Sequence, residues 1–560
     1  SISEFFEKQE SQNYEKEIPE RIMHGAKRFS GAKLNFIDPI LRHGQVQGNA
    51  LALICQSETT GRETLTWDEL RAQVASLAAH LKDMGVGEGD RVVAVLPNTP
   101  ASIIAFMATA SLGAVWSLCA PDMGHVAIID RFAQIEPKVL ITQDGYRHAG
   151  KMIDRRAVMQ IVRDGLPSVQ VNVVLPVVAD LPEGCIAWDS LLDRTAELHP
   201  AQADFDHPIR EAYSSGTTGN PKPIVHGHGG TMLEGAKQSL HQDLKRGERF
   251  CWLTSSGWIM WNTQLIALGQ GLTVAQFDGA PNYPDFSAVW RFVADEKLSY
   301  FGAGAAFYAS CMKAGIEPGR EQNLRHLASL GSTGSPLSDD AYDWIYRDVK
   351  TDVWLSPISG GTDFCGAFVC GNPNEVVRRG EMQVRALGNA VRAFDDAGQD
   401  VIGQVGELVC TEPLPSMPLY FWGDEDGTRL HDSYFDTYPG IWRHGDWIEI
   451  TATGGSVIYG RSDATINRKG LRMGSAEIYQ AVEGLDFVMD SLVIDLEFLG
   501  RESFMPLFVV LRDGHEMSDG VRDQINQAIR TGVSARFLPN EIVQIEEVPR
   551  TLSGKSWRFR

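Results

Sequence analysis

One glycine-rich segment of the chain carries the side chains needed to bind phosphate groups. It reads Y-S-S-G-T-T-G-N-P-K and runs from Tyr213 to Lys222. Glycine allows backbone conformations in which successive N–H groups point toward one anion, while hydroxyl and ammonium groups add further donors. The spacing differs from the G-x-x-x-x-G-K-S/T motif, because the lysine follows a proline. The candidate phosphate-binding residues are Ser215, Gly216, Thr217, Thr218, Gly219 and Lys222. A flexible surface loop is the alternative interpretation of this segment taken alone.

Two segments resemble signatures of the adenylate-forming enzymes, a family that includes acyl-CoA synthetases, luciferases and peptide-synthetase adenylation domains. The first is the loop that ends at Lys222, and the second is P-R-T-L-S-G-K, which ends at Lys555. In that family a carboxylate attacks the α-phosphorus of ATP, and a thiol then displaces AMP from the acyl-adenylate. The resemblance implies ATP, Mg²⁺ and the co-substrate coenzyme A, together with a small carboxylic acid.

The residues that follow the loop resemble one branch of this family. Residues 221–230 read P-K-P-I-V-H-G-H-G-G, as in acetoacetyl-CoA synthetases, whereas most of the family has glycine after the lysine. The resemblance covers nearly the whole chain, although those enzymes are commonly longer. It implies an AMP-forming ligase that joins acetoacetate to coenzyme A. The alternatives are a ligase for another short-chain acid and a free-standing adenylation enzyme that loads a carrier protein.

The resemblance also implies roles for residues outside the loop. Lys555 resembles the adenylation lysine, whose ammonium group can stabilise charge that develops at the α-phosphate. Thr362 and Asp363 match the motif in which a threonine contacts the nucleotide phosphate and an acid helps to hold Mg²⁺. Asp446 matches the acid that binds both ribose hydroxyls. The remaining implied nucleotide-binding residues are Gly334, Ser335, Pro336, Arg461 and Arg472.

A cluster of aromatic residues after a predicted strand is the candidate acyl pocket. It includes Trp258 and Met260, and it resembles the acyl-binding segment of acetoacetyl- and acetyl-CoA synthetases. Gly360 and Gly361 belong to the same pocket in this interpretation. Enzymes that use acetate carry a tryptophan at the position of Gly360, so we expect glycine to leave room for a longer acid. No residue of the sequence identifies a donor for the keto oxygen of acetoacetate.

Alternating helical and strand patterns must position these residues. Thr66 and Glu69 form a capping box before a helical apolar pattern, and Arg91–Pro97 then reads as a buried strand. The same alternation recurs downstream and predicts an α/β fold with mainly parallel sheets. Between about residues 376 and 459 short strands and turns predict a small β-rich subdomain.

A domain boundary is expected at Gly460–Asp463. Residues 1–460 would form a large N-terminal domain of several subdomains that binds ATP and the acid. Residues 461–560 would form a small mobile α+β domain, with Ser475 as the N-cap of its first helix. The resemblance implies a hinge near Asp463, about which this domain rotates between the two reaction steps.

Composition excludes several classes of function. The chain has 560 residues and a net charge of −21, which disfavours nucleic acid and anionic membranes as partners. Eight scattered cysteines form no C-x-x-C pair, as is typical of reduced thiols in the cytoplasm. We find no signal peptide and no apolar run long enough to insert into a membrane. The sequence does not indicate an oligomeric state.

Overall fold

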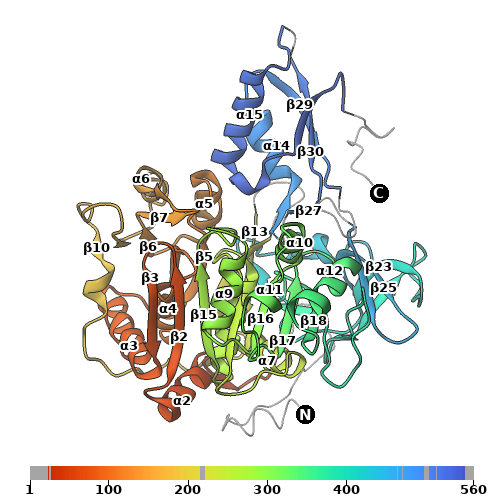
Figure 1. The fold of residues 1–560 in the computed structure, drawn as a ribbon. Coiled ribbons are helices and arrows are strands. Elements are labelled where there is room, and N and C mark those ends of the chain that lie inside the picture. Colours follow the sequence, from red (N-terminus) through yellow and green to blue (C-terminus); the bar gives the residue numbers. More distant parts are fainter. Residues whose placement is uncertain are drawn as a thin grey trace.

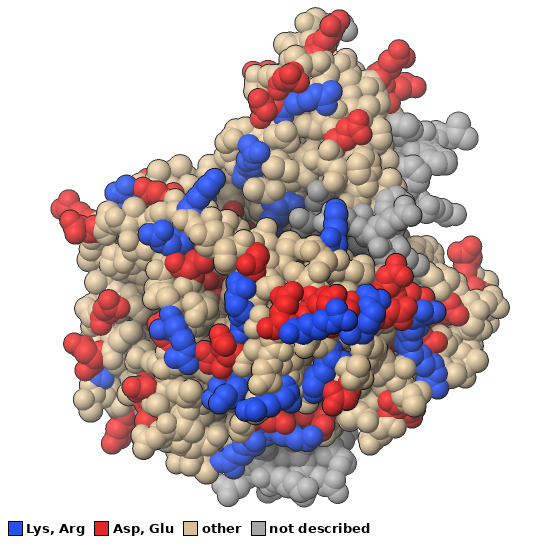
Figure 2. Space-filling view, viewed as in Figure 1, with Lys and Arg blue, Asp and Glu red and all other residues tan. Residues whose placement is uncertain are grey.

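The computed structural model describes residues 23, 27–214, 221–462, 465–468, 471–496, 503–512 and 514–548. Figure 1 shows a large body built around two sheets, a small β-rich part beside it, and a C-terminal part, coloured blue, above both. Acidic and basic side chains are interspersed over the face seen in Figure 2.

The first large sheet has eight strands and is mostly parallel. Neighbouring strands are parallel from β10 to β12, and the last two pairings are antiparallel. In spatial order the strands are β10 (Ile186–Ala187), β9 (Val171–Leu175), β6 (Val139–Gln143), β4 (Arg91–Val95), β5 (Val115–Cys119), β12 (Pro208–Ser214), β13 (Lys222–Gly227) and β24 (Tyr420–Phe421). The candidate phosphate loop therefore connects two paired strands, β12 and β13.

The second large sheet has seven strands, of which only the pair β2–β3 is antiparallel. Its order is β18 (Trp354–Pro357), β17 (Ser329–Thr333), β16 (Tyr300–Gly304), β14 (Arg249–Trp252), β15 (Thr273–Asp278), β2 (Leu51–Ser57) and β3 (Gly61–Thr66). The predicted α/β fold with mainly parallel sheets is confirmed.

Helices fill the space between the two sheets. The main core cluster joins α3 (Trp67–Asp83), α4 (Pro100–Ser111) and α8 (Asn262–Gly269) to strands of both sheets, and every residue of α4 is buried. The predicted capping box is present, since Thr66 and Glu69 bond each other's backbone N–H groups. Before the C-terminal part, the other described α-helices are α2 (Asp38–Gln47), α5 (His125–Phe132), α6 (Arg156–Asp164), α7 (His228–His241), α9 (Ser287–Asp295), α10 (Ala305–Lys313), α11 (Pro318–Glu321), α12 (Asp339–Trp344) and α13 (Thr428–Tyr434).

Short strands form the β-rich part, as predicted. One sheet pairs β22 (Val391–Phe394), β23 (Val405–Cys410), β25 (Trp442–Ile450) and β26 (Ser456–Arg461). A smaller sheet pairs β19 (Ser359–Gly361), β20 (Gly366–Cys370) and β21 (Val384–Arg385). These sheets share a separate core with α13, in which the rings of Tyr434 and Trp442 stack at 3.7 Å.

The C-terminal part has its own apolar core. It contains β27 (Thr465–Arg468), β28 (Leu471–Gly474), α14 (Ser475–Glu483), β29 (Val488–Val493), β30 (Pro506–Leu511), α15 (Asp519–Gly532) and β31 (Glu541–Gln544). The prediction that Ser475 caps α14 is wrong by one residue, because Ser475 is the first residue of the helix. A capping hydroxyl would accept a hydrogen bond from a backbone N–H, whereas the buried hydroxyl of Ser475 makes no hydrogen bond.

Among the described residues, three polar contacts join the C-terminal part to α5 and the turn before it. The N–H of Gly124 donates to the carbonyl of Val533 at 3.2 Å. Arg131 pairs with Glu477 at 3.3 Å, and Asp122 pairs with Arg536 at 2.7 Å. A Cβ atom at Gly124 would overlap the carbonyl oxygen of Thr531, so glycine is needed for this close approach.

All eight cysteines are free, and seven of them are buried. Among the described residues, no helix is both long and apolar enough to cross a bilayer.

Candidate active site

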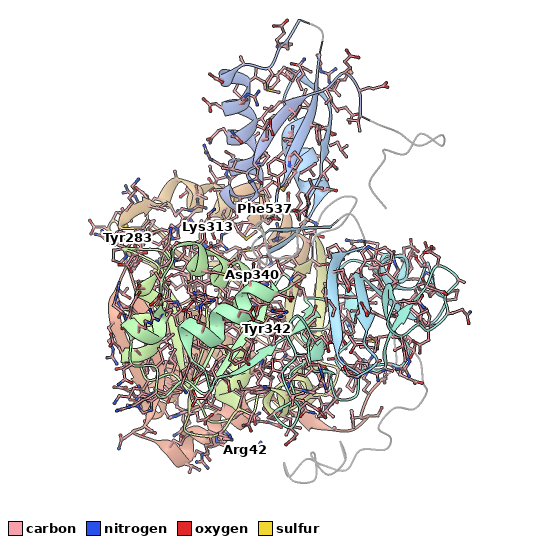
Figure 3. All side chains as sticks on the ribbon, turned by 45° about the vertical axis from the view of Figure 1, so that its right-hand side comes forward. Arg42, Tyr283, Lys313, Asp340, Tyr342 and Phe537 are labelled. Atoms are coloured by element: carbon pink, nitrogen blue, oxygen red, sulfur yellow. The ribbon has the colours of Figure 1, made fainter. Side chains whose placement is uncertain are left out.

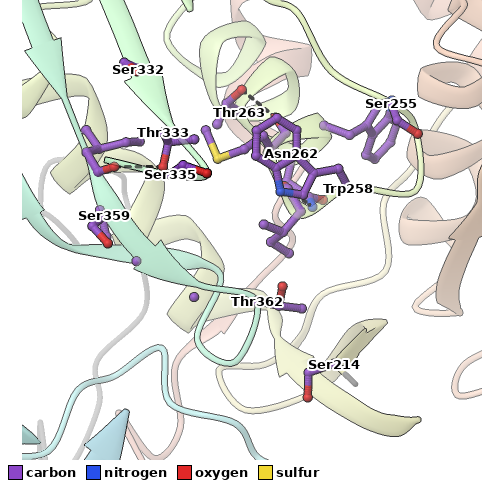
Figure 4. Close-up of a pocket in the computed structure, with 18 of the residues that line it drawn as sticks. Ser214, Ser255, Trp258, Asn262, Thr263, Ser332, Thr333, Ser335, Ser359 and Thr362 are labelled. Carbon is purple, nitrogen blue, oxygen red and sulfur yellow. Dashed lines mark hydrogen bonds between the residues drawn. The ribbon is translucent and has the colours of Figure 1, made fainter. Parts of the chain in front are cut away.

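A cavity of about 840 Å³ opens where the two large sheets present their carboxyl ends. Its walls include the ends of β5, β12, β17 and β18, with β26 from the β-rich part. Ligands of open α/β folds bind in such crevices, and this volume is within the range of small-molecule sites. Figure 4 shows the side chains of Ser335, Trp258 and Thr362 around the same opening.

Most of the predicted site residues that the structure describes line this one cavity. They come from five separate segments of the chain, so the fold brings distant motifs together. These residues are Trp258, Met260, Gly334, Ser335, Pro336, Gly360, Gly361, Thr362, Asp446 and Arg461. Ser214, the last described residue before the candidate phosphate loop, also lines it.

Two predicted residues do not line the cavity. Lys222 donates from Nζ to the hydroxyl of Ser433 at 2.7 Å and lies near the ring of Tyr434. Asp363 is 8% exposed, and its Oδ1 accepts a hydrogen bond from Tyr434. The structure therefore places both side chains beside α13, and neither is among the described residues that line the cavity.

Several predictions lie outside the described residues. These are the roles of Ser215, Gly216, Thr217, Thr218, Gly219, Asp463 and Lys555. The backbone of Arg472 is described in β28, where it pairs with Asn467.

Asp446 and Arg461 form an ion pair at the edge of the cavity. They face each other across β25 and β26, and the Nη1 of Arg461 lies 3.0 Å from Oδ1 of Asp446. Nε2 of His444 lies 3.5 Å from Oδ2 of the same carboxylate. The Asp446 side chain is 4% exposed, so the pair holds this carboxylate in a fixed orientation. A carboxylate held in this way can accept two hydrogen bonds from neighbouring hydroxyl groups.

The loop after β17 is also fixed. Thr333 donates from Oγ1 to the carbonyl of Ile358 at 2.7 Å, and Gly334 has a φ of 92°. That conformation favours glycine and turns the chain sharply into Ser335–Pro336. The loop thus presents backbone groups to the cavity.

The C-terminal part closes one side of the cavity. Glu477, Val533, Ser534, Arg536 and Phe537 belong to its lining. Figure 3 labels Phe537 at the base of this part, with Asp340 and Tyr342 of α12 in the body below it. The site is therefore built from both parts of the chain.

Gly360 lacks a side chain for a reason that sequence reasoning missed. It pairs with Ala367 across β19 and β20. A Cβ atom at Gly360 would overlap the carbonyl oxygen of Gly366 and lie 2.6 Å from the Cα of Ala367. The expectation was that glycine leaves space for the acid. In this structure the missing side chain is required by the close approach of the β20 backbone.

Replacing Gly360 with alanine should therefore lower stability by about 1–3 kcal/mol, the usual cost of overpacking. Urea denaturation would measure the loss. Gly87→Ala is the matched control, because a Cβ atom at Gly87 meets nothing within 4 Å. A Gly360→Ala protein as stable as the wild type would show that the Cβ position faces open space.

Two buried histidines, His226 and His228, follow the candidate phosphate loop. His226 contacts the carbonyls of Thr362 and Asp363 through Nε2, and burial lowers its pKa to about 3. Nδ1 of His228 accepts from the N–H of Phe36 at 3.1 Å, and burial lowers its pKa to about 3 as well. Both imidazoles are therefore neutral at pH 7.

These histidines predict a loss of stability in mild acid. Below the ordinary histidine pKa of 6.5 the unfolded chain takes up protons that the folded chain excludes, so stability falls as pH falls from 6.5 toward 3. Each histidine contributes up to about 1.4 kcal/mol per pH unit.

His228→Asn, which keeps an acceptor for Phe36, should reduce by about 1 kcal/mol the stability difference between pH 6.5 and pH 5.5. Urea midpoints at the two pH values measure it. The exposed His199→Asn is the control, with a side chain that is 83% exposed. An unchanged pH dependence in His228→Asn would contradict the assignment.

The donor set near the cavity fits Mg²⁺. Among the described residues no cluster of three or more His, Cys, Asp or Glu side chains could hold a metal ion. Magnesium commonly takes only one or two protein carboxylates and completes its shell with phosphate oxygens and water. The carboxylate of Asp363 and the hydroxyl of Thr362 are oxygen donors of this kind, next to each other in the chain.

Sequence reasoning also missed Arg210, which lines the cavity from β12 and is 3% exposed. The signal was present, since Arg210 and Glu211 are consecutive charged residues in a strand that precedes the candidate phosphate loop. Interior strands of a mostly parallel sheet are normally apolar. Burial raises the pKa of Glu211 to about 8, so its carboxyl group is largely protonated at pH 7.

Comparisons with known proteins show the family of this chain. The family model described as AMP-binding enzyme matches residues 41–421. Acetoacetyl-coenzyme A synthetase of Rhizobium meliloti (strain 1021) is 42% identical, over 95% of this chain and 82% of that protein. Acetoacetyl-CoA synthetase of Mus musculus is 38% identical, over 94% of this chain and 80% of that protein.

One solved structure is similar over nearly the whole chain. The acetoacetyl-CoA synthetase from Streptomyces lividans superposes with a TM-score of 0.80 at 43% identity, covering 98% of this chain and 85% of that one. The chain therefore belongs to the AMP-binding enzyme family, together with the acetoacetyl-CoA synthetases to which it is similar.

Proposed function

We propose that this protein is an ATP-dependent ligase that joins acetoacetate to coenzyme A. The acid attacks ATP to form acetoacetyl-adenylate and pyrophosphate, and coenzyme A then displaces AMP to give the thioester. The observation that carries the proposal is the single cavity that gathers the predicted nucleotide and acyl residues from distant segments. The names of relatives that match nearly the whole chain support acetoacetate as the acid.

We assign roles to residues on the basis of their place in this cavity. Asp446, oriented by Arg461, would accept hydrogen bonds from the ribose hydroxyls, and the backbone of Gly334–Pro336 would pack beside adenine. Thr362 would contact the phosphates. Asp363 would hold Mg²⁺, as its motif implies, once its carboxylate turns from Tyr434 toward Thr362. The metal ion neutralises phosphate charge when bound. Trp258, Met260 and Gly361 would surround the acyl group.

The proposed division of the chain follows its contacts. Residues 1–460 would hold ATP and the acid, and residues 461–560 would close over them and carry Lys555 and Arg472, with the hinge near Asp463. Separate apolar cores in the body and in the C-terminal part support this division.

We also propose a cellular location and a class of partner for this protein. Eight free cysteines support a cytoplasmic location, where thiols stay reduced. The net charge of −21 supports small molecules, and not nucleic acid, as partners.

The test is release of pyrophosphate and AMP with acetate, butyrate, acetoacetate and 3-hydroxybutyrate compared under the same conditions. We expect AMP to form with acetoacetate in the presence of ATP, Mg²⁺ and coenzyme A, and kcat/KM to be highest for that acid. Pyrophosphate release without thioester formation would indicate an enzyme that loads another acceptor. No pyrophosphate release with any acid would exclude the ligase reaction.

A further inference from the structure

Arg210 is a buried cation inside the cavity. It lies in β12, in the interior of the first large sheet, and is 3% exposed. Its guanidinium group donates to Oδ1 of Asn262 and to Sγ of Cys365. Its Nε is buried and has no hydrogen-bond partner. Both partners are uncharged, because burial raises the pKa of the Cys365 thiol.

In the part of the chain that the structure describes, no carboxylate forms an ion pair with Arg210. Burial lowers the pKa of Arg210, and the group beside it among the described residues is the neutral thiol of Cys365. Glu211 is the next residue of the strand, so its side chain points to the opposite face. Glu234 is paired with Lys237 at 2.7 Å, and Asp363 is bonded to Tyr434. His226, which is close enough to Arg210 for its pKa to be lowered by it, is neutral.

A buried guanidinium group without a paired carboxylate lowers the stability of the ligand-free protein. A guanidinium group remains protonated under all ordinary conditions, and burying it without a countercharge costs several kcal/mol. A ligand oxygen that reaches the guanidinium would recover part of that cost. The structure therefore favours a ligand that brings an acceptor to this position.

The contacts of Arg210 place it in the candidate acyl pocket. Asn262 begins α8 directly after the segment with Trp258 and Met260, and all three line the cavity. Cys365 follows Thr362 in the loop after β19 and has a φ of 51°, a left-handed conformation uncommon for residues other than glycine. The guanidinium thus connects the two segments between which the acid would lie.

We propose that Arg210 determines acid specificity by binding an oxygen acceptor at the far end of the substrate. This inference rests on the proposed function and names the chemical group of the acid that Arg210 would recognise. The acceptor is the 3-oxo group of a 3-oxo acid such as acetoacetate, or the second carboxylate of a short dicarboxylic acid. An acid with a plain alkyl end would leave the guanidinium buried and unpaired.

Three acids of nearly equal size separate these cases. Acetoacetate, malonate and butyrate differ at the far end, which is an acetyl, a carboxylate or an ethyl group. We expect the wild type to use acetoacetate or malonate with a kcat/KM at least about 10²-fold above that for butyrate, because sites built for a polar group reject analogues that lack it. A preference for acetoacetate identifies the carbonyl as the acceptor, and a preference for malonate identifies the carboxylate; either supports the inference.

Arg210→Met should remove this preference. The ratio compares kcat/KM for acetoacetate or malonate, whichever the wild type uses better, with kcat/KM for butyrate. It should fall to within about tenfold, while activity with butyrate persists. Arg28→Met is the matched control, because Arg28 is equally buried but pairs with Asp206 outside the cavity. It should leave the ratio unchanged. A wild type that uses butyrate as well as the other acids, or a ratio that survives in Arg210→Met, would overturn the inference and leave the ligase reaction intact.

Removing a buried arginine can unfold a protein, so a second variant is needed. Asn262→Asp keeps the arginine and supplies an internal carboxylate beside it. Like Arg210→Met, it should lower the ratio of kcat/KM for acetoacetate or malonate to that for butyrate. An unchanged ratio would contradict the inference. Calorimetric titration of malonate and acetoacetate into wild type and Asn262→Asp tests recognition without catalysis. Binding that the variant does not weaken would overturn the role of Arg210 even if no acid released pyrophosphate.

Discussion

Replacing Lys555 with alanine should slow formation of the acyl-adenylate by about 10²–10³-fold. The reason is electrostatic, because an ammonium group at the α-phosphate stabilises charge that develops as the carboxylate attacks. Pyrophosphate release measures this half-reaction. Thioester formation from preformed acetoacetyl-adenylate involves no attack on ATP, so it should proceed at close to the wild-type rate.

The control for this experiment is Lys313→Ala, which removes an exposed lysine of α10. It should leave both half-reactions unchanged. Equal losses in adenylation and thioester formation in Lys555→Ala would contradict the proposed role and point instead to a general defect of the C-terminal part.

Replacing Asp446 with asparagine should raise the KM for ATP by about 10- to 10²-fold. Hydrogen bonds to a charged group contribute about 1.5–3 kcal/mol, and the amide can no longer accept two of them equally well. The substitution also leaves Arg461 without the carboxylate that pairs with it at 3.0 Å. Steady-state kinetics at varied ATP, with the acid saturating, would measure the effect.

A double-mutant cycle separates binding from orientation. Arg461→Gln keeps the carboxylate but removes the pairing cation, and its side chain is 11% exposed. If Arg461 acts by orienting Asp446, the two substitutions together should cost less than the sum of their separate effects. An unchanged KM for ATP in Asp446→Asn would remove Asp446 from the nucleotide site.

The architecture followed from local patterns to a large extent. Apolar runs such as Arg91–Val95 form the interior strands, and the capping box at Thr66 begins α3 as predicted. The small β-rich part was visible from the density of short strands between residues 376 and 459. These features depend on neighbours in sequence, which is why the sequence was sufficient for them.

The site was predictable only in part, because side-chain direction depends on distant elements. Asp363 was identified by its motif, but Tyr434, 71 residues away, bonds its carboxylate, and Asp363 is not among the described residues that line the cavity. Gly360 was interpreted by pocket size, whereas its constraint comes from the β20 backbone. The charged residues of its strand marked Arg210 as unusual, but its surroundings depend on Asn262 and Cys365, which are distant in sequence.

The contacts between the C-terminal part and α5 have a consequence for how this part responds to salt. Among the described residues, two ion pairs and one backbone hydrogen bond attach this part to α5 and the turn before it, and the Asp122–Arg536 pair is partly exposed to solvent. Salt weakens the exposed Asp122–Arg536 pair, whereas it screens the largely buried Arg131–Glu477 pair much less. Ionic strength should therefore act on the attachment of this part mainly through Asp122–Arg536.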